Sequence, residues 1–227
     1  MSKINYDGFE LDTFDAAKKF RNYQIYYLKS YIKDPFLEVG AGKGGLTNLY
    51  EKFTKDITLL EPDNKLFQIL KKKFKRKKIK IKNQTIDKIK FKYQTIIYFD
   101  VLEHIKDDLK EVKVASKKLK KSGNLIFNVP AHQLFYNEFD KAVGHFKRYN
   151  KKDFQDIEKK TDLKIEKLIY YDSIGLLFLI LNKIFRLKKT NLKNKIYFWN
   201  ILIPLSKIID KLTFNKFGKS LLCVFKK

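Results

Sequence analysis

Cysteine is almost absent from this sequence, with Cys223 as the only one in 227 residues. A lone cysteine excludes a disulfide framework within one chain, and it excludes a zinc cluster built from cysteines and histidines. The scarcity of cysteine points to a reducing compartment such as the cytoplasm. We therefore expect neither disulfides nor a bound metal.

Long apolar runs are missing as well. The most apolar run, Ile174 to Leu181, falls far short of the roughly 20 residues that cross a bilayer. Residues Met1 to Gly8 lack the apolar core of a signal peptide. We expect a cytoplasmic protein that is either soluble or attached peripherally to the inner face of the membrane.

Arginine is scarce although the chain is strongly basic. The formal net charge is +25, yet the arginines are only Arg21, Arg76, Arg148 and Arg186, so lysine carries nearly all of the excess. Positive charge attracts nucleic acids and anionic membranes, but proteins that read phosphates and bases usually rely on arginine for its paired hydrogen bonds. Abundant Phe, Tyr, Ile and Asn also suggest the codon bias of an AT-rich genome. The charge alone is weak evidence for a nucleic-acid partner.

Short apolar segments alternate with helical stretches up to about residue 130. Strands are expected at 36–39, 57–60, the end of 71–82, 95–99 and 124–129, and helices at 13–31, 46–53, 64–74 and 107–119. This alternation is typical of a parallel sheet with crossover helices on both faces. No repeat or linker interrupts the chain, so we expect one α/β domain over residues 1–227.

The last third of the chain is less regular, with strands expected at 163–170 and 220–225. Between them lie two hydrophobic, lysine-flanked stretches, 174–187 and 196–212. Core or cap helices are the simplest interpretation of these stretches. Docking on a membrane surface is the alternative, which the flanking lysines favour.

Glycines at positions 40, 42 and 45 lie between the first expected strand and a helix, and they match the pattern G-x-G-x-x-G. Glycine lets a backbone approach a ligand closely, and a helix N-terminus offers unpaired N–H groups to a negative group. The pyrophosphate of a dinucleotide and the carboxylate of a methionine both suit such a loop. The pattern alone leaves both classes of ligand open.

Acidic residues around the loop separate the two classes. Glu38 lies two residues before Gly40, where it would repel a pyrophosphate but attract the amino group or sulfonium of S-adenosylmethionine. Glu61 ends the second strand about 20 residues on, the position at which an acid accepts ribose hydroxyls. Asp87 follows the third strand and can accept from an adenine amino group, and Asp100 ends the fourth strand. These acids favour S-adenosylmethionine.

Four blocks of the sequence resemble, in order and spacing, the motifs of class I S-adenosylmethionine-dependent methyltransferases: Leu37 to Gly44, Leu60 to Asp63, Val101 to Ile105 and Ser122 to Leu125. The resemblance implies a Rossmann-like, doubly wound α/β sheet of seven strands, mostly parallel with an antiparallel last strand, and a helical insertion before that strand. It implies S-adenosyl-L-methionine as the cofactor. The residues expected to bind it are Glu38, Gly40, Ala41, Gly42, Glu61, Pro62, Asp87, Asp100, Val101 and His104.

A narrower resemblance covers the rest of the chain. Residues 128–132, 138–140, 143–149 and 218–221 are similar to a bacterial group of methyltransferases often encoded beside enzymes for cell-surface saccharides and lipids. The acceptor is then expected to be a small polar, saccharide-linked or lipid-linked molecule. On this interpretation 1–34 is an N-terminal helical segment and 35–130 the cofactor-binding half. Residues 131–227 form the acceptor-side half, with the insertion at about 172–215.

Histidines are the candidates for proton transfer at the acceptor. A hydroxyl or ammonium acceptor needs a base, and histidine suits neutral pH. His145 is the first candidate base, and His132 and His104 are the others. Asp140, Arg148 and Tyr149 are candidate acceptor-binding residues, because a guanidinium pairs well with phosphate or carboxylate. A purely structural role, with His145 bonded to Asp140 or Tyr149, is the alternative.

Two other functions stay open. The basic charge favours an RNA methyltransferase, although residues 128–131 read Asn-Val-Pro-Ala and lack the Asn/Asp-Pro-Pro-aromatic motif of amino-methylating nucleic-acid enzymes. Cys223, in the last expected strand, is badly placed for the nucleophile of a cytosine C5 enzyme. A non-catalytic cofactor-binding module is the other alternative, against which the intact acids argue.

Overall fold

The computed structural model describes residues 11–185 and 192–227 of the chain. Residues 1–8, in which no signal peptide is expected, and 186–187, the end of the first hydrophobic stretch, lie outside these ranges. Within the described ranges, no helix is long and apolar enough to cross a bilayer.

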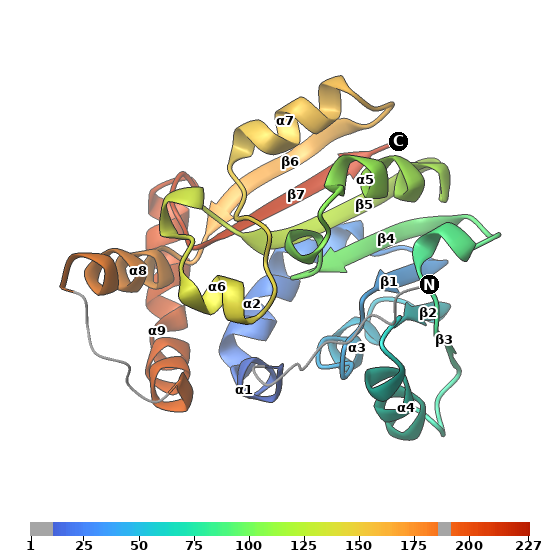
Figure 1. Ribbon diagram of the computed structural model, residues 1–227, viewed down its shortest axis with the longest axis horizontal. Helices are drawn as coiled ribbons and strands as arrows, with labels where there is room; N and C mark the ends of the chain where they lie inside the picture. The colour runs from blue at the N-terminus through green and yellow to red at the C-terminus, as the bar shows by residue number, and fades with distance from the viewer. Residues whose placement is uncertain (1–10, 186–191) are drawn as a thin grey trace.

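The centre of the protein is one sheet with the strand order β3-β2-β1-β4-β5-β7-β6 (Figure 1). The strands are β1 (Phe36–Val39), β2 (Ile57–Leu60), β3 (Ile79–Lys82), β4 (Tyr93–Phe99), β5 (Leu119–Pro130), β6 (Lys164–Tyr171) and β7 (Ser220–Lys226). β7 pairs antiparallel with β5 and with β6, and the other paired strands run parallel. The expected seven-stranded sheet with an antiparallel last strand is confirmed.

Helices pack on both faces of this sheet. They are α1 (Leu11–Asp15), α2 (Lys18–Leu28), α3 (Thr47–Tyr50), α4 (Asn64–Lys73), α5 (Asp108–Lys117), α6 (Glu138–Ala142), α7 (Lys151–Lys159), α8 (Ser173–Phe185) and α9 (Leu192–Leu212). Side chains alternate between the faces along a strand, so Ile97 packs into the core formed with α2, α3, α4 and α9, while Ile96 packs into the core formed with α5 and α7. Both faces are therefore buried, as the continuous apolar strands predicted.

The single helix expected over 13–31 is wrong, because the chain breaks between α1 and α2. α1 ends at Asp15, and α2 begins at Lys18 after Ala17, whose ψ of 62° is not helical. Asp15 contacts Arg21 of α2 at 3.2 Å, and its carboxylate lies against Gly45 of the glycine loop. The break lets α1 lie across that loop while α2 packs on the sheet.

The expected insertion is helical, as α8 and α9, and buried acids tie it to the sheet. Asp172 accepts hydrogen bonds from Trp199 Nε1 at 3.0 Å and from Ser206 Oγ at 3.1 Å. Asp210 accepts from Tyr23 of α2 at 2.6 Å. These bonds fix α9 beside α2, on the same face of the sheet.

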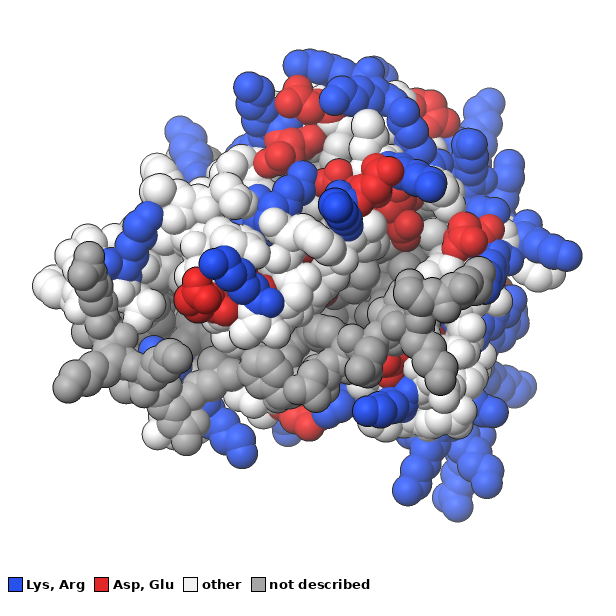
Figure 2. Space-filling model, in the orientation of Figure 1, with Lys and Arg blue, Asp and Glu red and all other residues white. Residues whose placement is uncertain are grey.

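Charge is unevenly spread over the surface that Figure 2 shows. Lysines and arginines crowd the end over α4 and β3, whereas the opposite end, over α8, carries few charged side chains. Part of the lysine run serves the fold, since Lys73 Nζ donates to the carbonyl oxygens of Lys43 and Gly44 at 2.8 and 2.9 Å.

Candidate functional site

The glycine loop follows β1 and is held against the ends of two neighbouring strands. Gly40, Gly42 and Gly44 have φ values of +70°, +55° and +68°, which residues with a side chain rarely adopt. The N–H of Gly40 donates to the carbonyl of Leu60, at the end of β2, at 2.9 Å. A Cβ on Gly40 would lie 2.7 Å from Cγ2 of Val101, which follows β4. The first glycine is therefore required by both conformation and space.

Glu61 lies directly beside this loop at the end of β2. Its Oε2 accepts from the N–H of Gly42 at 2.8 Å, and its Oε1 accepts from the N–H of Asp63 at 2.9 Å. Only 5% of the residue is exposed, and this burial raises the pKa of its carboxyl to about 7. Each carboxylate oxygen has two lone pairs, so both can accept one further hydrogen bond. Pro62 follows, with its carbonyl accepting from Asn83 Nδ2 at 3.0 Å.

Glu38 is turned toward α3. Its two oxygens accept from Thr47 Oγ1 at 3.0 Å and from the Tyr50 hydroxyl at 3.2 Å. Burial raises the pKa of this carboxyl to about 7, although the two hydrogen bonds lower it. Glu38 thereby anchors α3 beneath the glycine loop, and its contact with a ligand stays a prediction.

Asp100 follows β4 and belongs to a ring of polar side chains at the strand ends. Its Oδ1 accepts from Asn128 Nδ2 at 2.8 Å, and its Oδ2 lies 3.6 Å from Arg21 Nη1. Arg21 donates to Gln24, Gln24 donates to the Tyr171 hydroxyl, and Tyr171 donates to Asn128. The ring joins α2 to β4, β5 and β6. Arg21 is 7% exposed, and its Nε has no hydrogen-bond partner among the described residues.

Arg21 and Asn83 lie at the site but were not among the residues predicted from the sequence. Arg21 is one of the four arginines, and that scarcity was the signal that could have singled it out. Asn83, directly after β3, donates to the Glu61 carbonyl at 2.8 Å and so ties two strand ends together. Asp87 lies further on, exposed in a short turn (Ile86–Lys88), where it accepts from Thr85. Its role toward adenine stays a prediction.

Two of the three histidines meet at a second cluster. The rings of His104 and His145 lie 4.7 Å apart at 82°. Burial lowers the pKa of His104 to about 4, with His145 adding to the effect. Glu103 is 1% exposed, and its Oε1 lies 3.9 Å from His145 Nε2. Burial raises the pKa of Glu103 well above its usual range.

Asp140 fixes the orientation of the His145 ring through its Nδ1 atom. Its Oδ1 lies 2.8 Å from His145 Nδ1, and Arg148 Nε donates to both of its oxygens at 3.0 and 2.9 Å. Burial opposes the ionisation of Asp140, but the bonds from His145 and Arg148 outweigh it and hold its pKa below the usual range. The structure therefore brings together three residues expected on the acceptor side.

His132 and Tyr149 have other partners. His132 Nε2 lies 3.0 Å from the Gly218 carbonyl, and its ring stacks on Tyr170 at 4.6 Å. The buried Tyr149 hydroxyl lies 3.2 Å from the Leu102 carbonyl oxygen and 3.0 Å from an Asp108 carboxylate oxygen, and it donates its one hydrogen between them. Tyr149 thus stabilises the turn that carries Glu103. His132 contacts the backbone just before β7.

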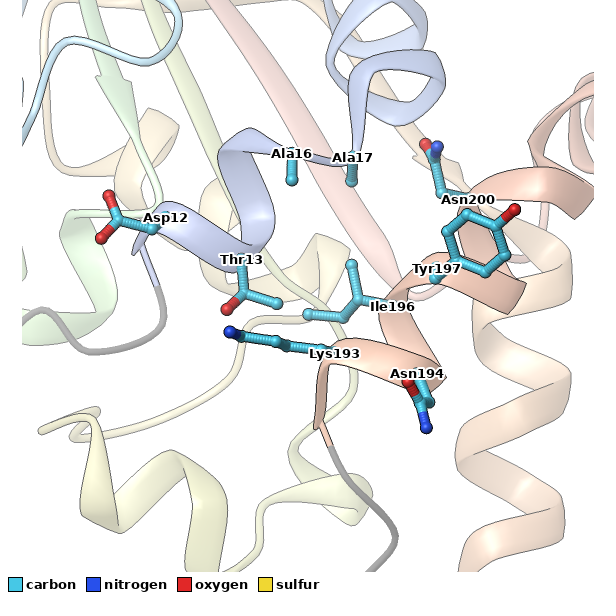
Figure 3. Close-up of a pocket in the computed structure, with 9 residues that line it drawn as sticks. All are labelled: Asp12, Thr13, Ala16, Ala17, Lys193, Asn194, Ile196, Tyr197 and Asn200. Carbon is cyan, nitrogen blue, oxygen red and sulfur yellow. The ribbon is translucent and has the colours of Figure 1, made fainter.

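A cavity of about 510 Å³ lies between α1 and the start of α9. Figure 3 shows Thr13, Ala16 and Ala17 on one side of it and Ile196 and Tyr197 on the other. Its other lining residues are Asp12, Lys193, Asn194 and Asn200. No local pattern predicted this cavity, because it depends on the contact between two ends of the chain.

Comparison with known proteins assigns a family. The family described as a methyltransferase domain matches residues 16–168, and no curated protein sequence matches significantly. An S-adenosylmethionine-dependent methyltransferase from Clostridium acetobutylicum ATCC 824 is 16% identical, with a TM-score of 0.59 over 92% of this chain and 91% of that one.

Other solved structures agree in fold. A possible histamine N-methyltransferase from Thermotoga maritima is 13% identical, with a TM-score of 0.64 over 94% of this chain and 92% of that one. The N-methyltransferase NodS from Bradyrhizobium japonicum WM9, in complex with S-adenosyl-L-homocysteine, is 15% identical, with a TM-score of 0.62 over 98% and 93%. Because the match covers more than half of the chain, the chain belongs to the methyltransferase-domain family.

Proposed function

We propose that the chain holds S-adenosylmethionine across the glycine loop and passes its methyl group to a polar atom of a small, saccharide-linked or lipid-linked acceptor. The observation that carries this proposal is the buried Glu61 carboxylate. Two backbone N–H groups fix it at the strand end beside Gly42, and it retains lone pairs for two vicinal ribose hydroxyls.

The surrounding residues fit the other parts of the cofactor. Gly40, Ala41 and Gly42 give the loop a backbone that a ligand can approach closely, and Val101 packs against Gly40. The guanidinium of Arg21 suits a methionine carboxylate, since its buried Nε lacks a described partner. The Asp100 side chain is 45% exposed, which suits an amino group.

The cofactor supplies a methyl group on a sulfonium, and its transfer is an in-line displacement in which positive charge is dispersed. Alignment and exclusion of water can supply most of the rate. A hydroxyl acceptor must in addition lose a proton. The interpretation of His145 as the base stays a prediction; Asp140 holds its Nδ1, so Nε2 would be the atom that accepts the proton.

The outer face of α9 favours the lipid-linked class of acceptor. Apolar side chains recur there every three or four residues and are 43–72% exposed; they are Tyr197, Phe198, Ile201, Leu205, Ile208 and Leu212. Exposed lysines flank them at 193, 195, 207 and 211. An apolar stripe between lysines is the pattern of a helix that lies on an anionic membrane. We infer that α9 places the enzyme at such a surface.

The cofactor site is tested by calorimetry with S-adenosylmethionine. We expect Glu61→Gln, which keeps the size but removes the charge and one acceptor oxygen, to weaken binding by about 10- to 100-fold, since a charged hydrogen bond contributes about 1.5–3 kcal/mol. The control is Asp56→Asn, a half-exposed acid paired with Lys80, which should bind as the wild type does. Equal affinity of Glu61→Gln and wild type would remove the proposed role of Glu61.

The acceptor is tested by transfer of labelled methyl groups into fractionated cell extract. Label in lipid or saccharide supports the proposal. Label in RNA instead would replace it with the alternative that the net charge of +25 suggested. Cofactor binding without transfer to any fraction would point to a non-catalytic module.

A further inference from the structure

We propose that Glu103, His104 and His145 form a binding site for a divalent transition-metal ion, which would hold the acceptor. One ligand atom from each of these residues lies within 4.8 Å of the others. Two residues come from the short turn after β4 (Leu102–His104) and the third from the segment after α6. The expectation of no metal was based on cysteine, which this cluster does not use.

Glu103 is the first argument for a cation. Both of its carboxylate oxygens are buried without a hydrogen-bond partner among the described residues. A buried carboxylate in that condition is costly, and a bound cation is a partner that removes the cost. Asp100 and Asp140 add negative charge around it, and Arg148 is the cation nearby. Arg148 is bonded to Asp140, and its Nη1 has no described partner either, so the two groups do not satisfy each other.

The support behind His145 is the second argument. A histidine that binds a metal through one ring nitrogen usually gives the other to a carboxylate, which fixes the ring. His145 Nδ1 is held by Asp140 at 2.8 Å, so Nε2 is left on the side of Glu103. Arg148 in turn holds both oxygens of Asp140. The ring of His145 is therefore oriented independently of any ion.

The donor set indicates the class of metal. Two imidazoles and one carboxylate suit Zn²⁺, Fe²⁺ or Mn²⁺ better than Ca²⁺ or Mg²⁺, which prefer oxygen ligands. Bonds of about 2.0–2.2 Å place ligand atoms closer together than the 3.9 Å between Glu103 and His145 and than the 4.8 Å that bounds all three, so the ligands must move together when an ion binds. Three protein ligands leave positions open, as in catalytic rather than structural sites.

The open positions give the site a function that rests on the proposed methyl transfer. A cation there would bind an acceptor hydroxyl and lower its pKa. His145 Nε2 would then bind the metal and could not also act as the base, so the hydroxyl proton would pass to solvent. The oxygen would form a bond to the methyl carbon, the carbon–sulfur bond would break, and S-adenosylhomocysteine would leave. The acceptor class would then be a hydroxyl compound.

Metal binding is tested on the full chain after treatment with a chelator. Co²⁺ is titrated as a spectroscopic probe, and Zn²⁺ affinity is measured by calorimetry. We expect one ion per chain, a visible Co²⁺ band, and about 100-fold or greater loss of affinity in Glu103→Gln and His145→Ala. Asp140→Asn, which removes the carboxylate that orients His145 but no ligand atom, should lose about tenfold. His132→Ala is the control, because His132 is bonded elsewhere, and it should bind metal as the wild type does.

Two outcomes would overturn the site: no Co²⁺ band in the wild type, or the same affinity in Glu103→Gln and wild type. Glu103→Gln removes an unpartnered buried charge, so it should fold, and thermal unfolding without metal checks this. Cofactor calorimetry separates the two proposals. Metal binding without S-adenosylmethionine binding would leave the metal site standing and reject the proposed function, whereas the reverse result would reject only the metal site.

Discussion

Gly40 shows how much one residue can decide at the glycine loop. Its φ of +70° is costly for any residue with a side chain, and a Cβ would lie 2.7 Å from Val101 Cγ2. We expect Gly40→Ala to lower the free energy of unfolding by about 1–3 kcal/mol and to weaken cofactor binding. Denaturant unfolding and calorimetry measure the two effects.

A double variant separates the two causes. Val101→Ala removes the close contact but leaves the strained φ of residue 40 unchanged. The loss in free energy of unfolding in Gly40→Ala/Val101→Ala should therefore be smaller than the sum of the losses in the two single variants. It should still be larger than the loss in Val101→Ala alone. Strict additivity would contradict the contact, and full recovery would contradict the strain.

Two of the four arginines are buried and paired with acids. Arg21 and Arg148 are each 7% exposed and paired with acids, while most of the lysines are exposed. A planar guanidinium satisfies several acceptors at once, which an ammonium cannot do in the same geometry. In a chain that uses lysine so heavily, these arginines mark positions where geometry matters.

At the scale of elements, α1 is too short to be stable alone, because isolated helices need roughly 12 residues or more. Its contacts with the glycine loop hold it in place. Lys43 Nζ donates to Asp12 at 2.7 Å, and Leu11 lies 3.4 Å from the position of a Cβ on Gly42. The order of α1 is therefore tied to the loop that we expect to bind the cofactor.

α9 has two apolar faces, and only one is buried. Its inner face buries Ile196, Trp199 and Ile203 against the sheet core, while Leu205 and Ile208 on the outer face are 46% and 58% exposed. We expect the wild type to bind anionic vesicles more tightly than neutral ones, and less tightly as salt rises. Leu205→Ser/Ile208→Ser should lose about tenfold or more in vesicle affinity, measured by co-sedimentation.

The matched control for α9 is Phe91→Ser. Phe91 is 68% exposed but lies between β3 and β4, away from the insertion, so its vesicle affinity should not change. Both variants should bind S-adenosylmethionine normally. Membrane docking by α9 would be contradicted if the wild type did not bind anionic vesicles. An equal loss of vesicle affinity in both variants would also contradict it.

At the scale of the whole molecule, buried carboxyls make stability depend on pH. Burial raises the pKa of Glu38 from 4.5 to about 7, so between these values the folded chain binds more protons than the unfolded chain. The free energy of unfolding therefore falls as pH rises through this window. Glu38 contributes a fall of about 3 kcal/mol at most, from about 1.4 kcal/mol per pKa unit.

Glu38→Gln isolates this contribution. His104 acts in the opposite sense, because its pKa is lowered to about 4, but it is present in both proteins. The stability of the variant relative to the wild type should therefore increase from pH 5 to pH 8, as denaturant unfolding at each pH would show. A difference that does not change with pH would contradict the raised pKa of Glu38.

The sequence by itself determined the cofactor side of this protein. The glycine loop, Glu61 and the alternation of strands and helices are local patterns, and parallel strands necessarily bring their carboxyl ends to one edge. Even here, the break between α1 and α2 was missed, because Asp15 is drawn to Arg21 and to the loop by contacts that helical propensity does not record.

Only the tertiary structure decided which residues distant in the sequence come together. The meeting of Glu103 with His145, the ring through Arg21 and Tyr171, and the bond from Tyr23 to Asp210 join residues far apart in the sequence. No spacing rule predicts such pairs, because each forms only when the packing of several elements brings both partners together and removes them from water.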